Sequence, residues 1–126
     1  MSDLDALKGR KVLVVEDEMM IAMLVEDMLA DLGCEVVGPA HNLSGALAVV
    51  ADNRHMDAAL LDVNLGGQPV FAVADLLREK SIPIIFCTGY GDAGLREVDR
   101  GAAVLQKPYR ASELANALAK AFTVQA

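Results

Sequence analysis

The sequence predicts a doubly wound α/β domain built on one five-stranded parallel sheet with the strand order 2-1-3-4-5. Five short apolar runs of strand length alternate along the chain with segments whose apolar residues recur at every third or fourth position, as on one face of a helix. Parallel neighbours need crossover connections. Right-handed crossovers can cover both faces of the sheet with helices only if the chain reverses its winding once.

The size and composition of the chain limit what it can be. Its 126 residues, 54% hydrophobic and 23% charged, suit one globular domain, which we expect over residues 11–126 behind an N-terminal lead of residues 1–10. A net charge of -7 argues against nucleic acid as a partner. The longest apolar run, Met19–Val25, is too short to cross a membrane and residues 1–10 do not resemble a signal peptide, so we expect a cytoplasmic protein.

The first strand is expected over residues 11–15, where a β-branched run leads directly into Glu16 and Asp17. A helix follows, and Gly33 is expected to close it as a C-cap. Its apolar stripe consists of Ile21, Leu24, Val25, Met28, Leu29 and Leu32. The same helix carries Met19, Met20, Met23 and Met28. These methionines could form a promiscuous binding face, but filling of the core is the favoured interpretation.

The next strand is expected over residues 34–38 at an edge of the sheet, with Pro39 ending it. Leu43, Leu47 and Val50 mark the second helix. The third strand is an apolar run that stops at Asp62, shortly before Gly66 and Gly67, and it reads as buried on both faces.

The second half of the chain continues the alternation. A third helix has its stripe at Val70, Val73, Ala74 and Leu77, and a fourth strand covers residues 82–87. Residues 93–100 form a weakly patterned helix at best, residues 102–106 a fifth strand, and a last helix carries Leu114, Ala117, Leu118, Ala121 and Phe122. Cys34 and Cys87 are expected to be buried free thiols, and His41 and His55 to lie on the surface or in loops.

Charged and polar residues stand at the ends of four of these strands. Because the winding reverses between strands 1 and 3, Glu16, Asp17 and Asp62 are expected to converge on one crevice. Thr88 ends the fourth strand beside that crevice, and the long side chain of Lys107 can reach it from the end of the fifth. Each residue alone has a plainer explanation, as a helix cap, the start of a turn or a solvated strand end.

The three carboxylates together call for a cation. At separations of about 5 Å they repel by roughly 3 kcal/mol per pair at an effective dielectric constant near 20. Ligands that are all oxygen, without a histidine or a thiolate, suit a hard ion. The sequence therefore predicts a site for Mg²⁺ (or Mn²⁺) at this crevice.

From Lys11 to Phe122 the chain resembles the receiver domains of two-component response regulators, whose fold is flavodoxin-like. The resemblance rests on Glu16-Asp17, Asp62, Thr88 and Lys107-Pro108 at the ends of successive strands. It implies that Asp62 is the phosphoacceptor and that Asp17, Asp62 and the Asn64 backbone carbonyl bind Mg²⁺ directly, with Glu16 acting through water. It also implies that Thr88 and Lys107 hold phosphoryl oxygens.

The function implied by this resemblance is that of a single-domain response regulator. A sensor histidine kinase or a histidine phosphotransfer protein would supply the phosphoryl group, and a downstream protein partner or phosphate shuttling would carry the signal. The chain would not be an enzyme beyond its own phosphoryl transfer to Asp62 and hydrolysis from it. Aspartate can attack phosphorus directly, while Mg²⁺ and Lys107 neutralise charge on the equatorial oxygens.

The chain departs from the family at its switch. Val104 stands three residues before the lysine, where the family usually has a rotating aromatic residue. The run Phe86-Cys87-Thr88-Gly89-Tyr90 is similar to a subgroup with a Phe-Ala-Thr-Gly-Tyr signature, whose members are often stand-alone receivers paired with atypical histidine kinases. We therefore expect the switch at Tyr90, between the permissive Gly89 and Gly91.

Two other functions match parts of the sequence but not their context. Residues 89–94 match the GxGxxG nucleotide fingerprint, but only 32 residues follow Gly94, too few for a nucleotide-binding domain. An aspartate-nucleophile phosphatase of the haloacid dehalogenase type would need an acid two residues after its nucleophile. That position is Asn64, which cannot titrate.

Overall fold

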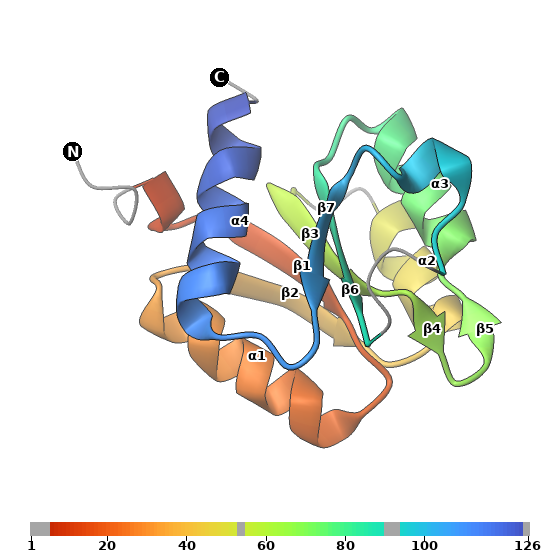
Figure 1. The fold of residues 1–126 in the computed structure, drawn as a ribbon, viewed down its shortest axis with the longest axis horizontal. Helices are drawn as coiled ribbons and strands as arrows, with labels where there is room; N and C mark the ends of the chain where they lie inside the picture. Colours follow the sequence, from red (N-terminus) through yellow and green to blue (C-terminus); the bar gives the residue numbers. More distant parts are fainter. Residues whose placement is uncertain (1–5, 53–54, 90–93, 125–126) are drawn as a thin grey trace.

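The chain forms one five-stranded parallel sheet with helices on both faces (Figure 1). The computed structural model describes residues 6–52, 55–89 and 94–124. The sheet has the order β2-β1-β3-β6-β7, which confirms the predicted order 2-1-3-4-5 for the five long strands. Their bounds are Lys11–Val15 (β1), Glu35–Ala40 (β2), Ala58–Asp62 (β3), Ile84–Thr88 (β6) and Ala103–Gln106 (β7).

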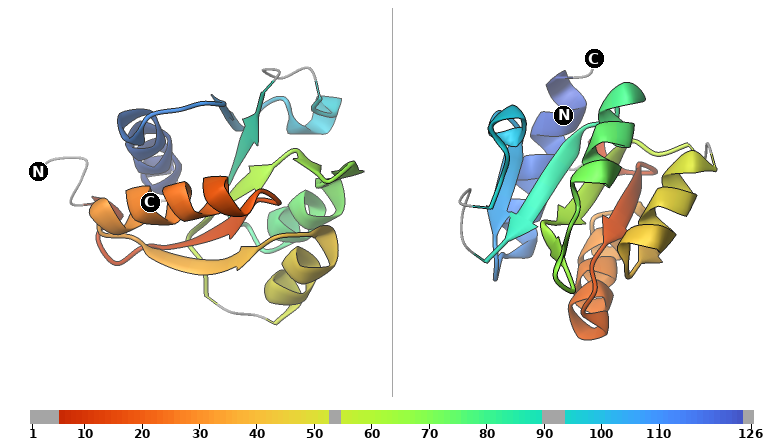
Figure 2. Two further views of the ribbon diagram at one scale, coloured as in Figure 1. Left: turned by 90° about the horizontal axis from the view of Figure 1, so that it is seen from below. Right: turned by 90° about the vertical axis from the view of Figure 1, so that its right-hand side faces the viewer.

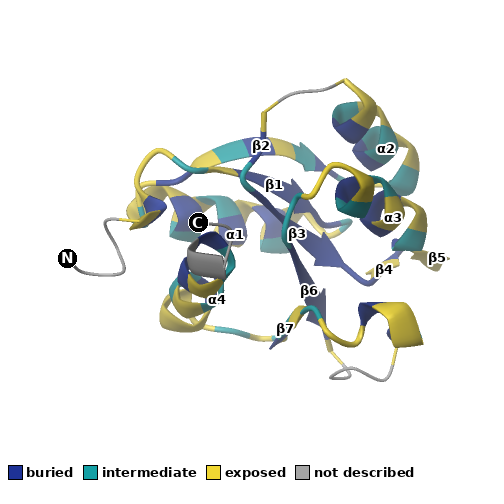
Figure 3. Cartoon of the chain, turned by 90° about the horizontal axis from the view of Figure 1, so that it is seen from above, coloured by how far each residue is buried: buried dark blue, intermediate teal, exposed yellow. Residues whose placement is uncertain are grey.

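Two separate cores lie on the two faces of the sheet, each beneath the helices that Figure 2 shows on that face. Helices α2 (Leu43–Ala51) and α3 (Phe71–Glu79) pack on one face, and α1 (Met19–Asp31) and α4 (Ala111–Val124) pack on the other. Successive residues of β1 alternate between the two cores, as the side chains of a strand must. The central strands β3 and β6 are buried along their whole length (Figure 3). No helix among the described residues is long and apolar enough to span a bilayer.

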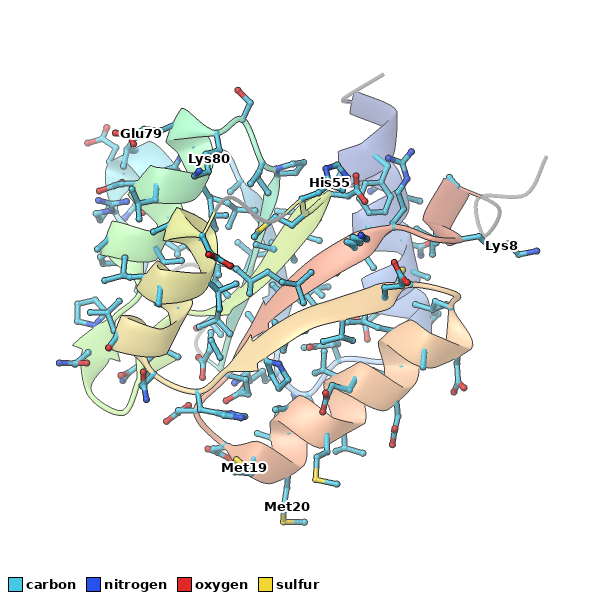
Figure 4. All side chains as sticks on the ribbon, turned by 180° about the vertical axis from the view of Figure 1, so that it is seen from behind. Lys8, Met19, Met20, His55, Glu79 and Lys80 are labelled. Carbon is cyan, nitrogen blue, oxygen red and sulfur yellow. The ribbon has the colours of Figure 1, made fainter. Side chains whose placement is uncertain are left out.

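Helix α1 buries a narrower stripe than its sequence predicts. Its buried residues are Ala22, Val25 and Leu29, and Gly33 follows the helix with a φ of +86°, as a closing glycine should. The expectation that the methionines fill the core is wrong for three of them: Met19 and Met23 are 60% exposed and Met20 is 80% exposed. Leu24, placed on the predicted stripe, is 58% exposed. Figure 4 shows Met19 and Met20 projecting away from the sheet.

Strand β2 does not end at Pro39 as predicted. The pairing of β1 with β2 shifts between Leu13 and Val15, and the strand resumes to Ala40 after this bulge. Gly38 has a φ of +91°, and a Cβ there would lie 2.9 Å from the Ala40 nitrogen, so the bulge requires glycine. The proline is tolerated because it occupies a bulge on an edge strand.

A two-stranded hairpin follows β3 and was not foreseen. Strands β4 (Asn64–Leu65) and β5 (Gln68–Pro69) pair antiparallel around Gly66 and Gly67, whose φ angles are +56° and +91°. A Gly-Gly pair between two residues of extended chain is a signal for a tight hairpin. The Asn64 side chain contributes to the turn by accepting a hydrogen bond from the Gly67 nitrogen at 2.8 Å.

The helix expected over residues 93–100 is reduced, in its described part, to a single 3₁₀ turn, Glu97–Asp99. A charged cluster anchors this turn. The fully buried Asp99 carboxylate accepts from Arg78 at the end of α3 and from Arg96 Nε at 2.7 Å, and Arg96 also reaches the exposed Asp75 at 2.8 Å. Burial opposes the charge on Asp99, but the hydrogen bonds from Arg96 and Arg78 outweigh it and lower its pKa.

The cysteines are buried free thiols, as predicted. Burial raises the pKa of Cys34, and it raises the pKa of Cys87 to about 12. His55 is exposed and His41 lies in the loop after β2, both as predicted. His41 is half-buried there, with Nδ1 3.1 Å from the Glu16 carbonyl oxygen.

Residues before β1 also contribute to the core. Leu7 is fully buried among α1, α4 and the start of the sheet, and its carbonyl accepts a hydrogen bond from Cys34 Sγ at 3.4 Å. The Arg10 guanidinium lies 4.6 Å from the centroid of the Phe122 ring in α4. The segment from Ala6 to Arg10 therefore packs against the domain.

We expect Leu7→Ala to lower the free energy of unfolding by about 2–5 kcal/mol, because it removes a fully buried side chain and leaves a cavity. Chemical denaturation monitored by circular dichroism measures this. Leu24→Ala is the matched control, since that leucine is 58% exposed and its truncation should cost little. Equal effects of the two substitutions would contradict the packing of Leu7.

Candidate functional site

The five predicted acidic, hydroxyl and amino side chains gather at the carboxyl edge of the sheet. Glu16 and Asp17 directly follow β1, and Asp62 ends the neighbouring β3. One carboxylate oxygen from each of these three residues lies within 4.8 Å of one from each of the others. Thr88 ends β6 and is buried, and Lys107 directly follows β7.

Lys107 joins the acidic residues into one cluster. Its Nζ lies 2.6 Å from Glu16 Oε1 and 3.2 Å from Asp62 Oδ2, and its backbone nitrogen donates to the Thr88 carbonyl at 2.8 Å. Burial disfavours the ammonium charge, but the hydrogen bond to Glu16 and the charges of Asp62 and Glu16 outweigh it and raise the pKa of Lys107. The lysine is therefore charged and anchored at the centre of the site.

Asp62 holds its proton far more tightly than an ordinary aspartate. Burial first, and the neighbouring charge of Glu16 second, raise its pKa to about 7, although Lys107 acts in the opposite direction. Asp62 Oδ1 also accepts a long hydrogen bond from the Asn64 nitrogen at 3.3 Å. The electrostatic cost of bringing the three carboxylates together is therefore expressed mainly as the raised pKa of Asp62.

Asp17 and Glu16 have different hydrogen-bond partners. The Gly66 nitrogen in the β4–β5 hairpin donates to Asp17 Oδ2 at 3.1 Å. Burial opposes ionisation of Asp17, but hydrogen bonds with the side chains of Asp62 and Glu16, and to a smaller degree from the Gly66 backbone, outweigh it and lower the pKa of Asp17. Both Glu16 oxygens are engaged, Oε1 by Lys107 and Oε2 by the Glu18 nitrogen at 3.1 Å. This suits the predicted role of Glu16 as an acid that acts through water.

The donor set fits a hard divalent cation. It offers oxygen atoms only, and a single ammonium group opposes three acidic side chains. Asp17 and Asp62 would hold such an ion. Coordination by the Asn64 carbonyl and by Glu16 through water stays a prediction.

Gly66 is the site residue that sequence reasoning missed. The signal was present as a Gly-Gly pair a few residues after Asp62, but the partner of Gly66 is 49 positions away in the sequence, so only the folded hairpin identifies it. Of the residues expected to form the switch, Gly89 is exposed beside Asp62 and Thr88, whereas Tyr90 and Gly91 lie outside the described residues. Val104 pairs with Phe86 in the sheet and packs against the α2–α3 core.

Comparison with known proteins identifies the family. A family model described as the response regulator receiver domain matches residues 12–119. The chain belongs to this family. No α-helix begins directly after Gly94 in the described residues, where the chain forms only the 3₁₀ turn Glu97–Asp99, whereas a nucleotide-binding fingerprint would open an α-helix there.

The relatives of this receiver domain include regulators of different lengths. The phyllosphere-induced regulator PhyR of Methylorubrum extorquens is 29% identical over 98% of this chain, which spans 47% of that protein. The chain thus spans about half the length of the curated relatives it matches. The solution structure of SdrG from Sphingomonas melonis is 41% identical, with a TM-score of 0.80 over 98% of this chain and 99% of that one. A structure of the anti-anti-sigma factor PhyR of Bartonella quintana is 26% identical, with a TM-score of 0.80 over 98% of this chain and 52% of that one.

We expect Asp62→Asn to stabilise the metal-free protein at pH 8 by an amount of the order of 2–4 kcal/mol, since one pKa unit corresponds to about 1.4 kcal/mol. The native state binds the Asp62 proton more tightly than the unfolded chain, with a pKa of about 7 against 3.8. Stability of the parent protein therefore falls as pH rises from about 4 to 7, and the variant lacks this loss. Lys107 keeps Glu16 as a partner in the variant.

Urea denaturation between pH 4 and pH 8 in the presence of a chelator measures the difference between the two proteins. Asp27→Asn is the matched control, because Asp27 is exposed on α1. A stabilisation by Asp62→Asn that is the same at pH 4 and pH 8 would contradict the raised pKa of Asp62.

Proposed function

We propose that the protein is a response regulator in which Asp62 accepts a phosphoryl group from a histidine kinase or a histidine phosphotransfer protein. The observation that carries the proposal is the position of Asp62, with Lys107 Nζ 3.2 Å away and the Glu16 and Asp17 carboxylates within 4.8 Å. A buried aspartate that only ended a strand would not need a lysine and two further carboxylates beside it.

The proposed transfer uses the groups of this site directly. An Asp62 oxygen attacks phosphorus, the bond from phosphorus to the donor's histidine nitrogen breaks, and the electron pair of that bond stays with the nitrogen. Lys107 exchanges part of its contact with Asp62 for a phosphoryl oxygen, and Thr88 donates its hydroxyl to another. A bound Mg²⁺ or Mn²⁺ would supply positive charge for the transferring group. Water later hydrolyses the acyl phosphate, so no separate substrate is turned over.

The exposed face of α1 supports a protein as the donor. Met19, Met20, Met23 and Leu24 form an apolar patch on the helix that begins directly after the acidic loop. We refer to these four residues as the α1 patch. Flexible apolar methionines suit protein recognition, and a patch beside the phosphoacceptor would dock the protein that delivers the phosphoryl group.

The output of the domain would also be a protein interaction. The chain carries a net charge of -7, which disfavours direct contact with nucleic acid. The PhyR of Bartonella quintana is described as an anti-anti-sigma factor, which supports a downstream protein partner here. Because Val104 cannot act as a rotating aromatic, the proposed switch is the segment from Gly89 to Gly91, with Tyr90 as its large side chain.

We expect acetyl phosphate to add one phosphoryl group to the protein only when Mg²⁺ or Mn²⁺ is present, because the acidic cluster otherwise repels the incoming phosphate. Intact-protein mass spectrometry measures the addition. Asp62→Asn should abolish it, whereas Asp27→Asn should not. Labelling that persists in EDTA, or in Asp62→Asn, would refute the assignment.

We expect the neutral double substitution Met20→Gln and Met23→Gln to slow phosphoryl transfer from a protein donor about tenfold, the effect of losing about 1.4 kcal/mol of apolar contact. Labelling by acetyl phosphate should stay within about twofold. Transfer from a panel of radiolabelled histidine kinases supplies the measurement, with Val98→Thr as the control because Val98 is 64% exposed on the 3₁₀ turn. Equal slowing with both kinds of donor would exclude the α1 patch as a docking surface.

A further inference from the structure

A groove of about 330 Å³ opens beside Asp62 and Thr88, on the side formed by the hairpin and the start of α3. Its wall is largely apolar and comes from Val63, Pro69 and Phe71, with Gly94 next to Val63. Glu16, Asp17 and Lys107 are not among the described residues that line it. The groove thus adjoins the proposed phosphoryl and metal site, sharing Asp62, Asn64 and Thr88 with it, and extends from there along the apolar wall.

Phe71 is held in this wall by an arginine. The Arg96 guanidinium lies 4.5 Å from the centroid of the Phe71 ring. The same guanidinium is fixed by Asp75 at 2.8 Å and by the fully buried Asp99 at 2.7 Å. A planar guanidinium that stacks on a ring while bonding two carboxylates has little freedom to move, so the ring is braced from outside.

We propose that this groove receives the leaving group of the phosphodonor and favours a flat heteroaromatic ring, the imidazole of phosphohistidine, over a small acyl group. The inference rests on the proposed role of Asp62 as phosphoacceptor. Phe71 is then a specificity-determining residue and Arg96 a positioning residue. An imidazole ring can stack on or pack edge-on against Phe71, whereas an acetate has no ring to do so.

Phosphoryl transfer to Asp62 releases a leaving group that suits this groove. The bond from the Asp62 oxygen to phosphorus forms as the bond from phosphorus to the imidazole nitrogen breaks, and the electron pair stays on that nitrogen. A ring that is protonated on its other nitrogen beforehand leaves as neutral imidazole. The neutral, flat product matches an apolar wall better than the acetate anion does, because an anion would lose hydration there without a partner.

The test compares two small donors, N-phosphoimidazole and acetyl phosphate, in the presence of Mg²⁺. The ratio of their second-order rate constants for labelling Asp62 cancels differences in folding or in the phosphoryl site that affect both donors. Phe71→Ala should lower this ratio about 2- to 12-fold, the range that corresponds to an aromatic contact. Arg96→Lys should also lower this ratio, because it loosens the ring of Phe71. Phe71→Tyr keeps the ring and should leave the ratio at the value of the parent protein.

Two further variants make the outcome decisive. Arg10→Gln removes the other stacked arginine, over Phe122, far from the site, and should leave the ratio unchanged. If Phe71→Ala fails to fold, Phe71→Leu keeps apolar bulk without the ring, and its ratio decides. An unchanged ratio in the Phe71 variants, or an equal fall in both rate constants, overturns the inference while leaving Asp62 as phosphoacceptor. Failure of both donors to label Asp62 in the parent protein overturns the proposed function as well.

Discussion

The ion pairs of Lys107 are the interaction on which the site depends. Its ammonium group lies within 3.2 Å of both Glu16 and Asp62. Lys107 follows β7 at one edge of the sheet, and its long side chain extends past the end of β6 to reach Asp62 on β3 and Glu16 after β1. Without it, the reversal of winding between β1 and β3 would bring three acids together with only single backbone N–H donors from Glu18, Asn64 and Gly66, and solvent, to offset their repulsion. The lysine offsets only part of this repulsion, so the pKa of Asp62 is still raised. A further positive charge at the site would therefore be bound favourably.

The sequence was sufficient for the architecture and for the assembly of the site. Short apolar runs mark the long strands, and apolar residues at every third or fourth position mark α1, α2, α3 and α4, since each element must bury one face or both. The order of the strands then follows from crossover handedness, and it is this order that brings Glu16 and Asp17 beside Asp62. Residues 91 positions apart, Glu16 and Lys107, could be placed together by topology alone.

Several of the errors share a physical cause, which is that the feature depends on contacts with parts of the chain distant in the sequence. The α1 methionines look like core residues because periodicity does not reveal how much of a helix the sheet covers. The anchored turn at Asp99 depends on Arg78 and Arg96, and a buried acid with two arginines leaves no periodic signal. Gly66 binds Asp17 through its backbone nitrogen, and every residue except proline has such a nitrogen, so the residue type does not reveal this role. Such contacts adjust the charges and walls of a site whose outline the strand ends already define.

The burial of both cysteines makes the protein a convenient subject for chemical labelling. Cys34 and Cys87 are shielded from solvent and their thiols resist ionisation at neutral pH, with Cys87 lying in the sheet directly beside Asp62. Alkylating reagents act on exposed thiolates, so they should pass over both native residues. A single cysteine introduced on the surface can therefore carry a fluorophore or a spin label without first removing Cys34 or Cys87, and β6 keeps its native packing beside Asp62 in such a reporter.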